Sequence, residues 1–142
     1  MIEFGKKIAG KEYKDRISAY AVIRNQKNEI AFARVGQGYF LPGGGMKDGE
    51  TSMQCAMREA LEEIGAVISI VREIGVAGEY GLTMNKKDHW HGVGTFFEAR
   101  VEKIIGPGVE PDHELAWLTF TDALPHIVRK AHSWAIGQTE PK

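Results

Sequence analysis

The stretch GGMKDGETSMQCAMREALEEIGA, residues 44–66, decides how the rest of this chain is interpreted. Its second part predicts a helix. Thr51 and Gln54 have the spacing of a capping box, in which each side chain bonds the backbone N–H of the other residue at a helix start. Gly65 is well placed to end the same helix, because glycine readily adopts the left-handed conformation found there.

Three carboxylates share one face of this predicted helix. At about 100° per residue, Glu59, Glu62 and Glu63 fall at i, i+3 and i+4. An apolar arc lies on a different face and comprises Met53, Ala56, Met57, Ala60, Leu61 and Ile64. Like charges at these spacings destabilise a helix by a few tenths of a kcal/mol per pair, and Arg58 is the local cation. The acidic face is therefore either a solvated surface or a site for cations.

The residues before the helix favour the second interpretation. The run from Leu41 to Gly45 reads LPGGG, which can turn tightly and bring backbone close to a ligand. Mg²⁺ is usually bound by a few carboxylates together with substrate phosphates. A glycine-rich loop that leads into a helix with three clustered carboxylates therefore predicts a site for hard divalent cations.

These residues resemble the signature of the Nudix hydrolases, and of the MutT-like members in particular. That signature is Gly, five residues, Glu, seven residues, Arg-Glu, an apolar residue, any residue, Glu-Glu, any residue, Gly and an apolar residue. The matching positions here are Gly44, Glu50, Arg58, Glu59, Ala60, Glu62, Glu63, Gly65 and Ala66. Both apolar positions are alanine, which is smaller than the usual aliphatic residue. The resemblance implies the Nudix fold, an α/β/α sandwich with a central mixed β-sheet.

The resemblance also implies an activity. Nudix hydrolases cleave a nucleoside diphosphate linked to another moiety, by attack of water on phosphorus, with Mg²⁺ or Mn²⁺. A MutT-like enzyme that removes unwanted nucleoside triphosphates is one candidate, and oxidised deoxynucleoside triphosphates, dinucleoside polyphosphates, ADP-ribose and nucleotide sugars are candidate substrates. The alternative is a Nudix-fold module that binds or senses a nucleotide without cleaving it. Dimers are common in the family, and the sequence leaves the oligomeric state open.

Metal ligands are carried over from the family residue by residue. The resemblance assigns Glu59, Glu62 and Glu63 as metal ligands, with the backbone carbonyl of Gly43 as one more. Many members use a further acidic ligand outside the signature. Here the preferred candidates are Glu110 and Glu114, in the loop before the strand around Trp117.

Catalytic and substrate-binding roles follow in the same way. Either Glu59 or Glu63 would act as base for the attacking water, Arg58 would orient a signature glutamate, and Glu50 would support them. The candidates for contact with substrate phosphate are Arg34, Gly43 and Gly44.

Length and composition limit the class of protein. The chain has 142 residues, which suits one domain spanning residues 1–142. Its net charge of −1 gives no overall basic field for a nucleic acid polymer. The single cysteine, Cys55, fits a reducing compartment, and no apolar run approaches the length that spans a membrane. We therefore expect a cytoplasmic protein. The resemblance implies a small nucleotide or nucleoside diphosphate derivative as its partner, and a homodimer is possible.

Other elements follow from apolar runs and turn residues. Residues 1–16 are expected to form an arm or a short hairpin, and residues 137–142 a frayed tail. The ranges expected to be strands are 17–24 and 29–35, paired as a hairpin, then 39–41, 67–79 as one or two strands, 89–101 and 115–120. A polar loop is expected over residues 80–88, and a last helix over 123–136, with Thr121 and Asp122 as its cap.

Overall fold

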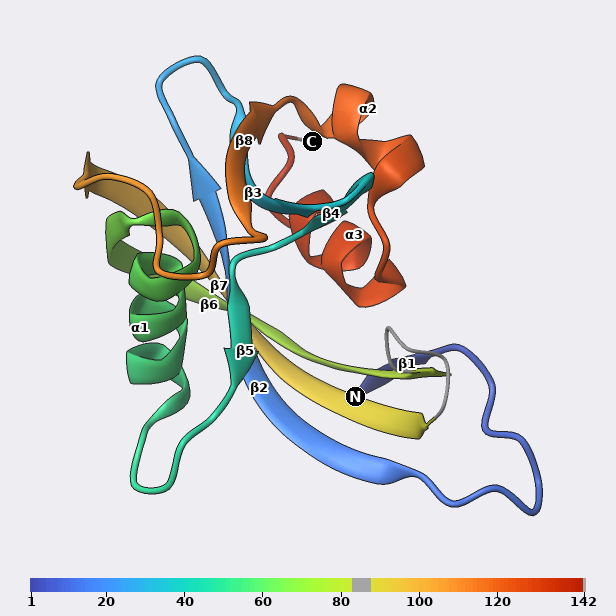
Figure 1. The fold of residues 1–142 in the computed structure, drawn as a ribbon. Helices are drawn as coiled ribbons and strands as arrows, with labels where there is room; N and C mark the ends of the chain where they lie inside the picture. The colour runs from blue at the N-terminus through green and yellow to red at the C-terminus, as the bar shows by residue number, and fades with distance from the viewer. Residues whose placement is uncertain (83–87, 142) are drawn as a thin grey trace.

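The computed structural model describes residues 1–82 and 88–141. Within them, several strands precede helix α1, further strands follow it, and short helices end the chain (Figure 1). The strands are β1 (Ile2–Phe4), β2 (Lys14–Arg24), β3 (Ile30–Val35), β4 (Gly38–Phe40), β5 (Gly43–Gly45), β6 (Ala66–Leu82), β7 (His89–Ile104) and β8 (Glu114–Leu118). The helices are α1 (Ser52–Ile64), α2 (Phe120–Ala123), the 3₁₀ turn η1 (Leu124–His126) and α3 (Lys130–Gly137).

The strands form one mixed sheet in the order β1-β6-β7-β2-β3-β4, with β5 also paired to β2 and β8 to β3. The β1–β6 and β2–β7 pairs are parallel, and the other pairs are antiparallel. The long β2–β7 register runs from Lys14 opposite Trp90 to Arg24 opposite Arg100. Helix α1 lies on one side of the sheet and α3 on the other (Figure 1). This confirms the predicted α/β fold with a central mixed sheet.

Both predicted ends of α1 are confirmed. The Thr51 side chain accepts a hydrogen bond from the Gln54 N–H at 3.1 Å, and the Gln54 side chain accepts one from the Thr51 N–H at 2.9 Å. Gly65 ends the helix with φ 65° and ψ 25°, a left-handed conformation that costs glycine little. A side chain there would also collide with the carbonyl of Gly106, so the helix end fixes the loop that follows β7.

The predicted apolar face of α1 is partly wrong. The residues that it buries are Cys55, Ala56, Ala60 and Ile64, together with one carboxylate, Glu63. The three long side chains at its edge, Met53, Met57 and Leu61, stay 41–46% exposed. Small residues at the contact let the helix lie close to the strands, and this leaves room for the long side chains only outside the contact.

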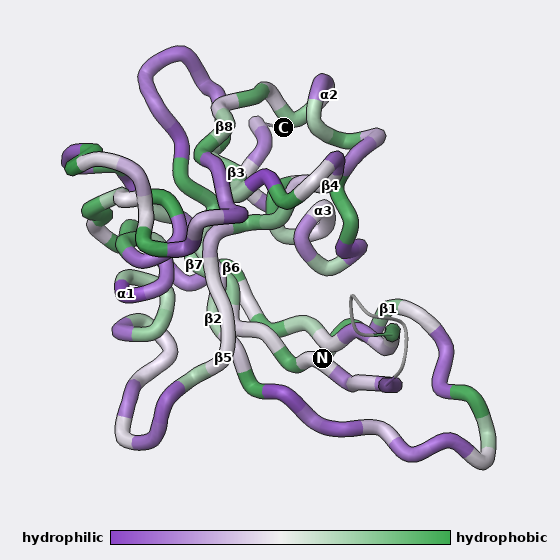
Figure 2. The backbone as a smooth tube through the Cα atoms, viewed as in Figure 1, coloured by the Kyte–Doolittle hydropathy of each residue, from purple (hydrophilic) through white to green (hydrophobic). Residues whose placement is uncertain are grey.

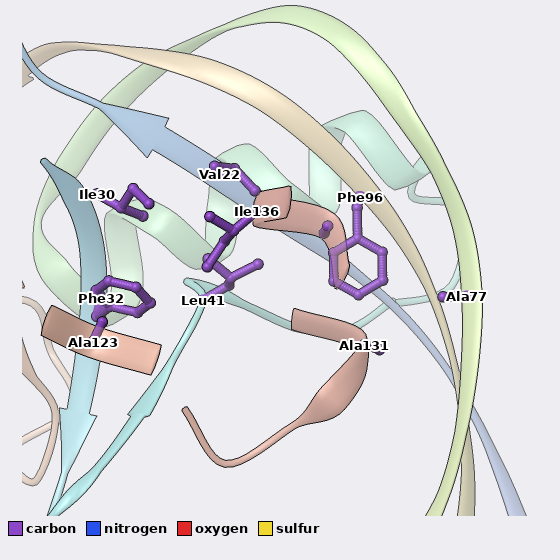
Figure 3. Close-up of a cluster of buried hydrophobic side chains, with 10 residues drawn as sticks. Val22, Ile30, Phe32, Leu41, Ala77, Phe96, Ala123, Ala131 and Ile136 are labelled. Carbon is purple, nitrogen blue, oxygen red and sulfur yellow. The ribbon is translucent and has the colours of Figure 1, made fainter. Parts of the chain in front are cut away.

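The other side of the sheet buries the larger core cluster (Figure 3). It joins residues of β2, β3 and β7 to residues of α3, and its largest members are Phe32 and Phe96. Phe96 also contacts Trp134 of α3, with ring centroids 6.0 Å apart. The even-numbered residues of β2 and β7 in this cluster show which face of these strands points toward α3.

The single helix expected over residues 123–136 is wrong. The chain instead forms α2, η1 and α3, and the first cap is Thr119, whose hydroxyl accepts from the Asp122 N–H at 3.3 Å. Pro125 lies in η1 and lacks the N–H that a continuous helix would use. Ile127 then adopts an extended conformation, so α3 starts only at Lys130.

The chain ends are held more firmly than expected. Ile2–Phe4 forms a parallel edge strand on β6, so the segment 1–16, expected as an arm or a short hairpin, pairs in part with the sheet and not with itself. At the other end, the guanidinium of Arg24 donates to Thr139 at 2.8 Å and to Glu140 at 3.2 Å, so the tail expected to fray is bonded at these two residues.

The remaining strand predictions hold with shifted limits. The turn between β2 and β3 forms, and Figure 2 shows it in hydrophilic colours. Residues 66–82 form one long strand, which takes in the start of the loop expected over 80–88; residues 83–87 of that loop lie outside the described residues. Across the described chain, the helices are too short and too polar to span a membrane.

Candidate active site

Helix α1 brings the three signature glutamates to the edge of the glycine strand β5. Their exposure differs: Glu63 is 7% exposed as a residue, whereas the side chains of Glu59 and Glu62 are 14% and 35% exposed. The face that the sequence predicts therefore forms, but it is not a solvated surface. Glu63 lies deepest, between the helix and the sheet.

The carboxylate of Glu63 is anchored by the sheet. Its Oε1 accepts a hydrogen bond of 2.7 Å from the backbone N–H of Gly43. Burial, together with the nearby charges of Glu59, Glu110 and Glu62, raises the pKa of Glu63 to about 8, although the hydrogen bond from the Gly43 N–H acts in the opposite direction. The clustered acids repel one another around a buried carboxylate. A bound divalent cation would reduce this repulsion.

The glycines of β5 give the carboxylates access to the backbone. Gly43 lies opposite Tyr20 in the antiparallel pair, and its N–H turns away from β2 toward Glu63. In an extended strand the N–H and C=O of one residue point to the same edge, so the Gly43 carbonyl also faces the glutamates. At Gly44, a methyl group would lie 2.9 Å from the carboxyl carbon of Glu59. Any residue larger than glycine at position 44 would displace the carboxylate of Glu59.

Arg58 connects the acidic residues. Its Nε and Nη2 donate to the two oxygens of Glu50 at 2.6 and 3.0 Å, a bidentate pair, and its Nη1 donates to Glu59 at 2.8 Å and to Glu62 at 3.1 Å. Nη2 also reaches the carbonyl of Gly45 at 3.1 Å. The hydrogen bonds from Arg58 lower the pKa of Glu50 to about 2. The arginine thus fixes Glu50 as an anion and orients two signature glutamates.

The loop after β7 completes the site. Val109 donates its N–H to the carbonyl of Glu62 at 2.7 Å, which docks the loop on the end of α1. His113 then lies with Nε2 at 3.5 Å from Oε2 of Glu63 and with Nδ1 at 3.1 Å from Asp112. The possible ligand atoms of Glu110, Asp112 and His113 lie within 4.8 Å of one another.

The two loop acids proposed from the sequence, Glu110 and Glu114, have different surroundings in the structure. Glu110 lies close enough to Glu63 to raise its pKa. Glu114 instead forms an exposed ion pair with Arg34, its neighbour across β3 and β8. No hydrogen bond or ion pair of the described residues joins Arg34 or Glu114 to the signature glutamates.

Sequence reasoning missed His113 and the anchoring of Glu63 by an N–H. The position of His113 in an acidic loop is a weak signal, because the distance in sequence from Glu63 hides their contact. The site as a whole offers carboxylate oxygens and one backbone carbonyl, which are the ligands that Mg²⁺ and Mn²⁺ prefer.

Comparison with known proteins gives one family. The model of the NUDIX domain matches residues 14–136. No curated protein matches the sequence. Three examples represent the solved structures that are similar. A MutT NUDIX hydrolase from Burkholderia pseudomallei is 25% identical, with 89% of this chain and 99% of that chain covered and a TM-score of 0.65.

The other two share the fold at lower identity. They are a NUDIX hydrolase from Nitrosomonas europaea (16% identical, 88% of each chain covered, TM-score 0.70) and the dihydroneopterin triphosphate pyrophosphohydrolase of E. coli (18% identical, 91% and 97% covered, TM-score 0.72). The family model covers most of the chain, and the signature glutamates meet on the strand-and-helix frame of that fold. The chain therefore belongs to the Nudix hydrolase family.

Proposed function

We propose that this protein hydrolyses a nucleoside diphosphate linked to another group, with Mg²⁺ or Mn²⁺, by attack of water on phosphorus. The observation that carries the proposal is the buried carboxylate of Glu63, held by the Gly43 N–H among three other acids. Nothing in the described residues supplies a cation to Glu63 itself, apart from the imidazole of His113. A site so rich in negative charge is suited to cations that accompany a phosphate chain.

The residues fit the metal by their chemistry. Glu59, Glu62 and Glu63, with the Gly43 carbonyl and Glu110, would hold it. When bound, the metal supplies charge neutralisation on the diphosphate and orientation for in-line attack. Arg34 and Glu114, which pair with each other, are not part of this set in our proposal.

The protein's own groups account for orientation and proton transfer. Arg58 keeps Glu59 and Glu62 in place through charged hydrogen bonds, and Glu50 keeps Arg58 in place. We propose that Glu59 or Glu63 takes the proton of the attacking water.

The substrate is a small nucleotide derivative. Similar structures include enzymes described as acting on dihydroneopterin triphosphate and as a UDP-X diphosphatase. For this chain we propose a nucleoside triphosphate, as in MutT-like enzymes, as the first class to test. The single cysteine, Cys55, is buried and unpaired, in agreement with a reducing cytoplasm as the setting.

The test is a phosphate-release screen with Mg²⁺ and with Mn²⁺. The panel comprises nucleoside triphosphates, dinucleoside polyphosphates, ADP-ribose and nucleotide sugars, and wild type is compared with Glu62→Gln/Glu63→Gln. We expect metal-dependent release from one class, reduced at least 100-fold in the variant, with the variant's thermal unfolding in EDTA showing that it is folded. Nucleotide binding by wild type without turnover of any class would instead identify a non-catalytic binding module. Equal turnover by the folded variant would overturn the metal assignment.

A further inference from the structure

Two arginines near the glutamates, Arg16 and Arg129, are not used by the site described above. Arg16 is in β2, and Arg129 directly precedes α3. Within residues 1–82 and 88–141, neither guanidinium makes a hydrogen bond or an ion pair with a side chain. Arg16 is exposed, whereas Arg129 is partly buried. Burial lowers the pKa of Arg129, and the charge of Glu79 opposes this effect without forming an ion pair with the guanidinium. Two ring contacts hold the Arg129 guanidinium in place but do not neutralise its charge.

The strand register places Arg16 on the face of the sheet that α3 covers. Arg16 pairs with Gly92, and Tyr20 pairs with Phe96, in one continuous parallel register. Residues an even number apart on a strand share a face, and Phe96 packs with α3. Arg16, Trp90 and Tyr20 therefore belong to the same face.

Trp90 brings Arg129 to the same place. A methyl group on Gly92 would lie 2.2 Å from the Trp90 indole, so the ring lies over Gly92, the register partner of Arg16. The guanidinium of Arg129 lies over that indole, 4.5 Å from the ring centroid, and 5.9 Å from the ring centroid of Phe40. Stacking between two rings orients the flat guanidinium and leaves its N–H groups available at the edge.

The charges around Tyr20 agree with this placement. Burial raises the pKa of the Tyr20 hydroxyl, Arg16 and Arg129 lower it, and Glu63 raises it. One hydroxyl group thus lies within electrostatic reach of both arginines and of the deepest signature glutamate.

Strand β5 lies between the arginines and the glutamates, and its glycines have no side chains. On its α3 face, a methyl group at Gly45 would lie 3.4 Å from Nε of Arg16, while on the opposite face Gly44 contacts Glu59. A phosphate chain that lies across this bare strand meets carboxylates on one side and guanidinium groups on the other. The first set suits a metal-bound diphosphate, and the second suits a phosphate that carries no metal.

We propose that Arg16 and Arg129 bind a third phosphate, so that the enzyme selects substrates with a chain of three or more phosphates over substrates with a simple diphosphate link. This inference rests on the proposed function, because it places the diphosphate at Glu59–Glu63. ADP-ribose and nucleotide sugars have only the two phosphates that the metal site takes, and would leave both guanidinium groups unpaired. A triphosphate pairs them with charge-assisted hydrogen bonds.

The first test measures binding without metal and without hydrolysis. Inorganic triphosphate and pyrophosphate are titrated calorimetrically in EDTA against wild type, Arg16→Gln/Arg129→Gln and the control Arg100→Gln. Arg100 is an exposed arginine at the far end of β7. We expect the double variant to bind triphosphate at least tenfold more weakly, with Arg100→Gln unchanged and pyrophosphate weaker than triphosphate in wild type. Equal triphosphate affinity in wild type and the double variant, or no triphosphate binding by wild type, would overturn the inference.

The second test measures turnover with Mg²⁺. The double variant should lose at least tenfold in kcat/KM for a nucleoside triphosphate and less than twofold for ADP-ribose. An equal loss for both substrates would show that Arg16 and Arg129 do not recognise the third phosphate. Arg129→Lys keeps the charge but not the flat fork, so we expect it to recover only part of the triphosphate affinity.

The two tests separate this inference from the proposed function. If the protein binds triphosphate through the arginines but releases no phosphate from any substrate, the hydrolysis proposal fails and the binding inference stands. If hydrolysis depends on Glu62 and Glu63 but the double arginine variant selects substrates as wild type does, the inference fails alone.

Discussion

Gly43 donates its backbone N–H to the carboxylate of Glu63 across 2.7 Å, which ties the glycine strand to the last turn of α1. A residue with a side chain at position 43 would meet the ring of Tyr20 at 2.2 Å and the carbonyl of Ala19 at 2.3 Å. The close approach of β5 to β2 and the position of Glu63 therefore depend on each other.

Glu63 should make the metal-free protein less stable as the pH rises. Its carboxyl has a pKa near 4.5 when the chain is unfolded and about 8 in the fold, so between these values the folded state holds one proton more. Stability from this group is therefore full below pH 4.5 and is lost progressively up to about pH 8. We expect Glu63→Gln to gain, relative to wild type, on the order of a few kcal/mol between pH 5 and pH 8.

The measurement is urea unfolding in EDTA at several pH values. The exposed Glu73→Gln serves as the matched control. A constant difference between Glu63→Gln and wild type across this range would show that Glu63 ionises normally in the fold. With Mg²⁺ present, the affinity of wild type for the metal should rise with pH up to about 8, because binding must displace the proton.

Gly44→Ala should impair catalysis more than stability. The added methyl would lie 2.9 Å from the carboxyl carbon of Glu59, so the carboxylate must move away from the strand while the backbone stays in place. We expect at least a tenfold fall in kcat/KM and a small change in Tm. Gly137→Ala is the control, since a methyl group there meets nothing within 4 Å. A Gly44→Ala enzyme of normal activity would mean that the position of Glu59 is not critical.

Arg58→Lys should also reduce activity at least tenfold, although it keeps the charge. A lysine has one ammonium group and cannot bond both oxygens of Glu50 while it reaches Glu59 and Glu62. Because the two residues act as a pair, the effects of Arg58→Lys and Glu50→Gln on kcat/KM should be smaller together than their sum. Strict additivity in this double-mutant cycle would count against a shared role.

His132 should make the fold sensitive to acid. It is 3% exposed, and its Nδ1 accepts the N–H of Leu41 at 3.1 Å. Burial, and then the charge of Arg129, lower its pKa to about 3. The unfolded chain therefore binds a proton near pH 6.5 that the fold excludes, and stability is lost as the pH falls below 6.5, by up to about 1.4 kcal/mol per pH unit.

The matched variant is His132→Gln, which keeps an acceptor for Leu41 but does not titrate in this range. It should cost about 1–3 kcal/mol at pH 7 through lost packing and show a weaker loss of stability between pH 6.5 and pH 4. Parallel curves for the two proteins would assign the acid sensitivity to other groups.

Local sequence accounts for the parts of this molecule that depend on neighbours in the chain. The capping box at Thr51, the left-handed end at Gly65 and the shared face of the glutamates follow from spacings of a few residues. Prediction failed where distant residues compete. Pro125 and the packing of α3 divide the last helix, and the small residues of α1 leave Met57 exposed.

The sequence by itself determined the family and the signature group of Arg58 and the glutamates, because a helix converts fixed spacing into a fixed face. The tertiary structure alone decided that Glu63 is buried against Gly43, that His113 lies beside it, that Arg16 lies beside Gly45, and that Arg129 lies over the rings of Trp90 and Phe40. These contacts join residues up to about a hundred positions apart, and only the strand register and the packing of the loops on the sheet bring them together.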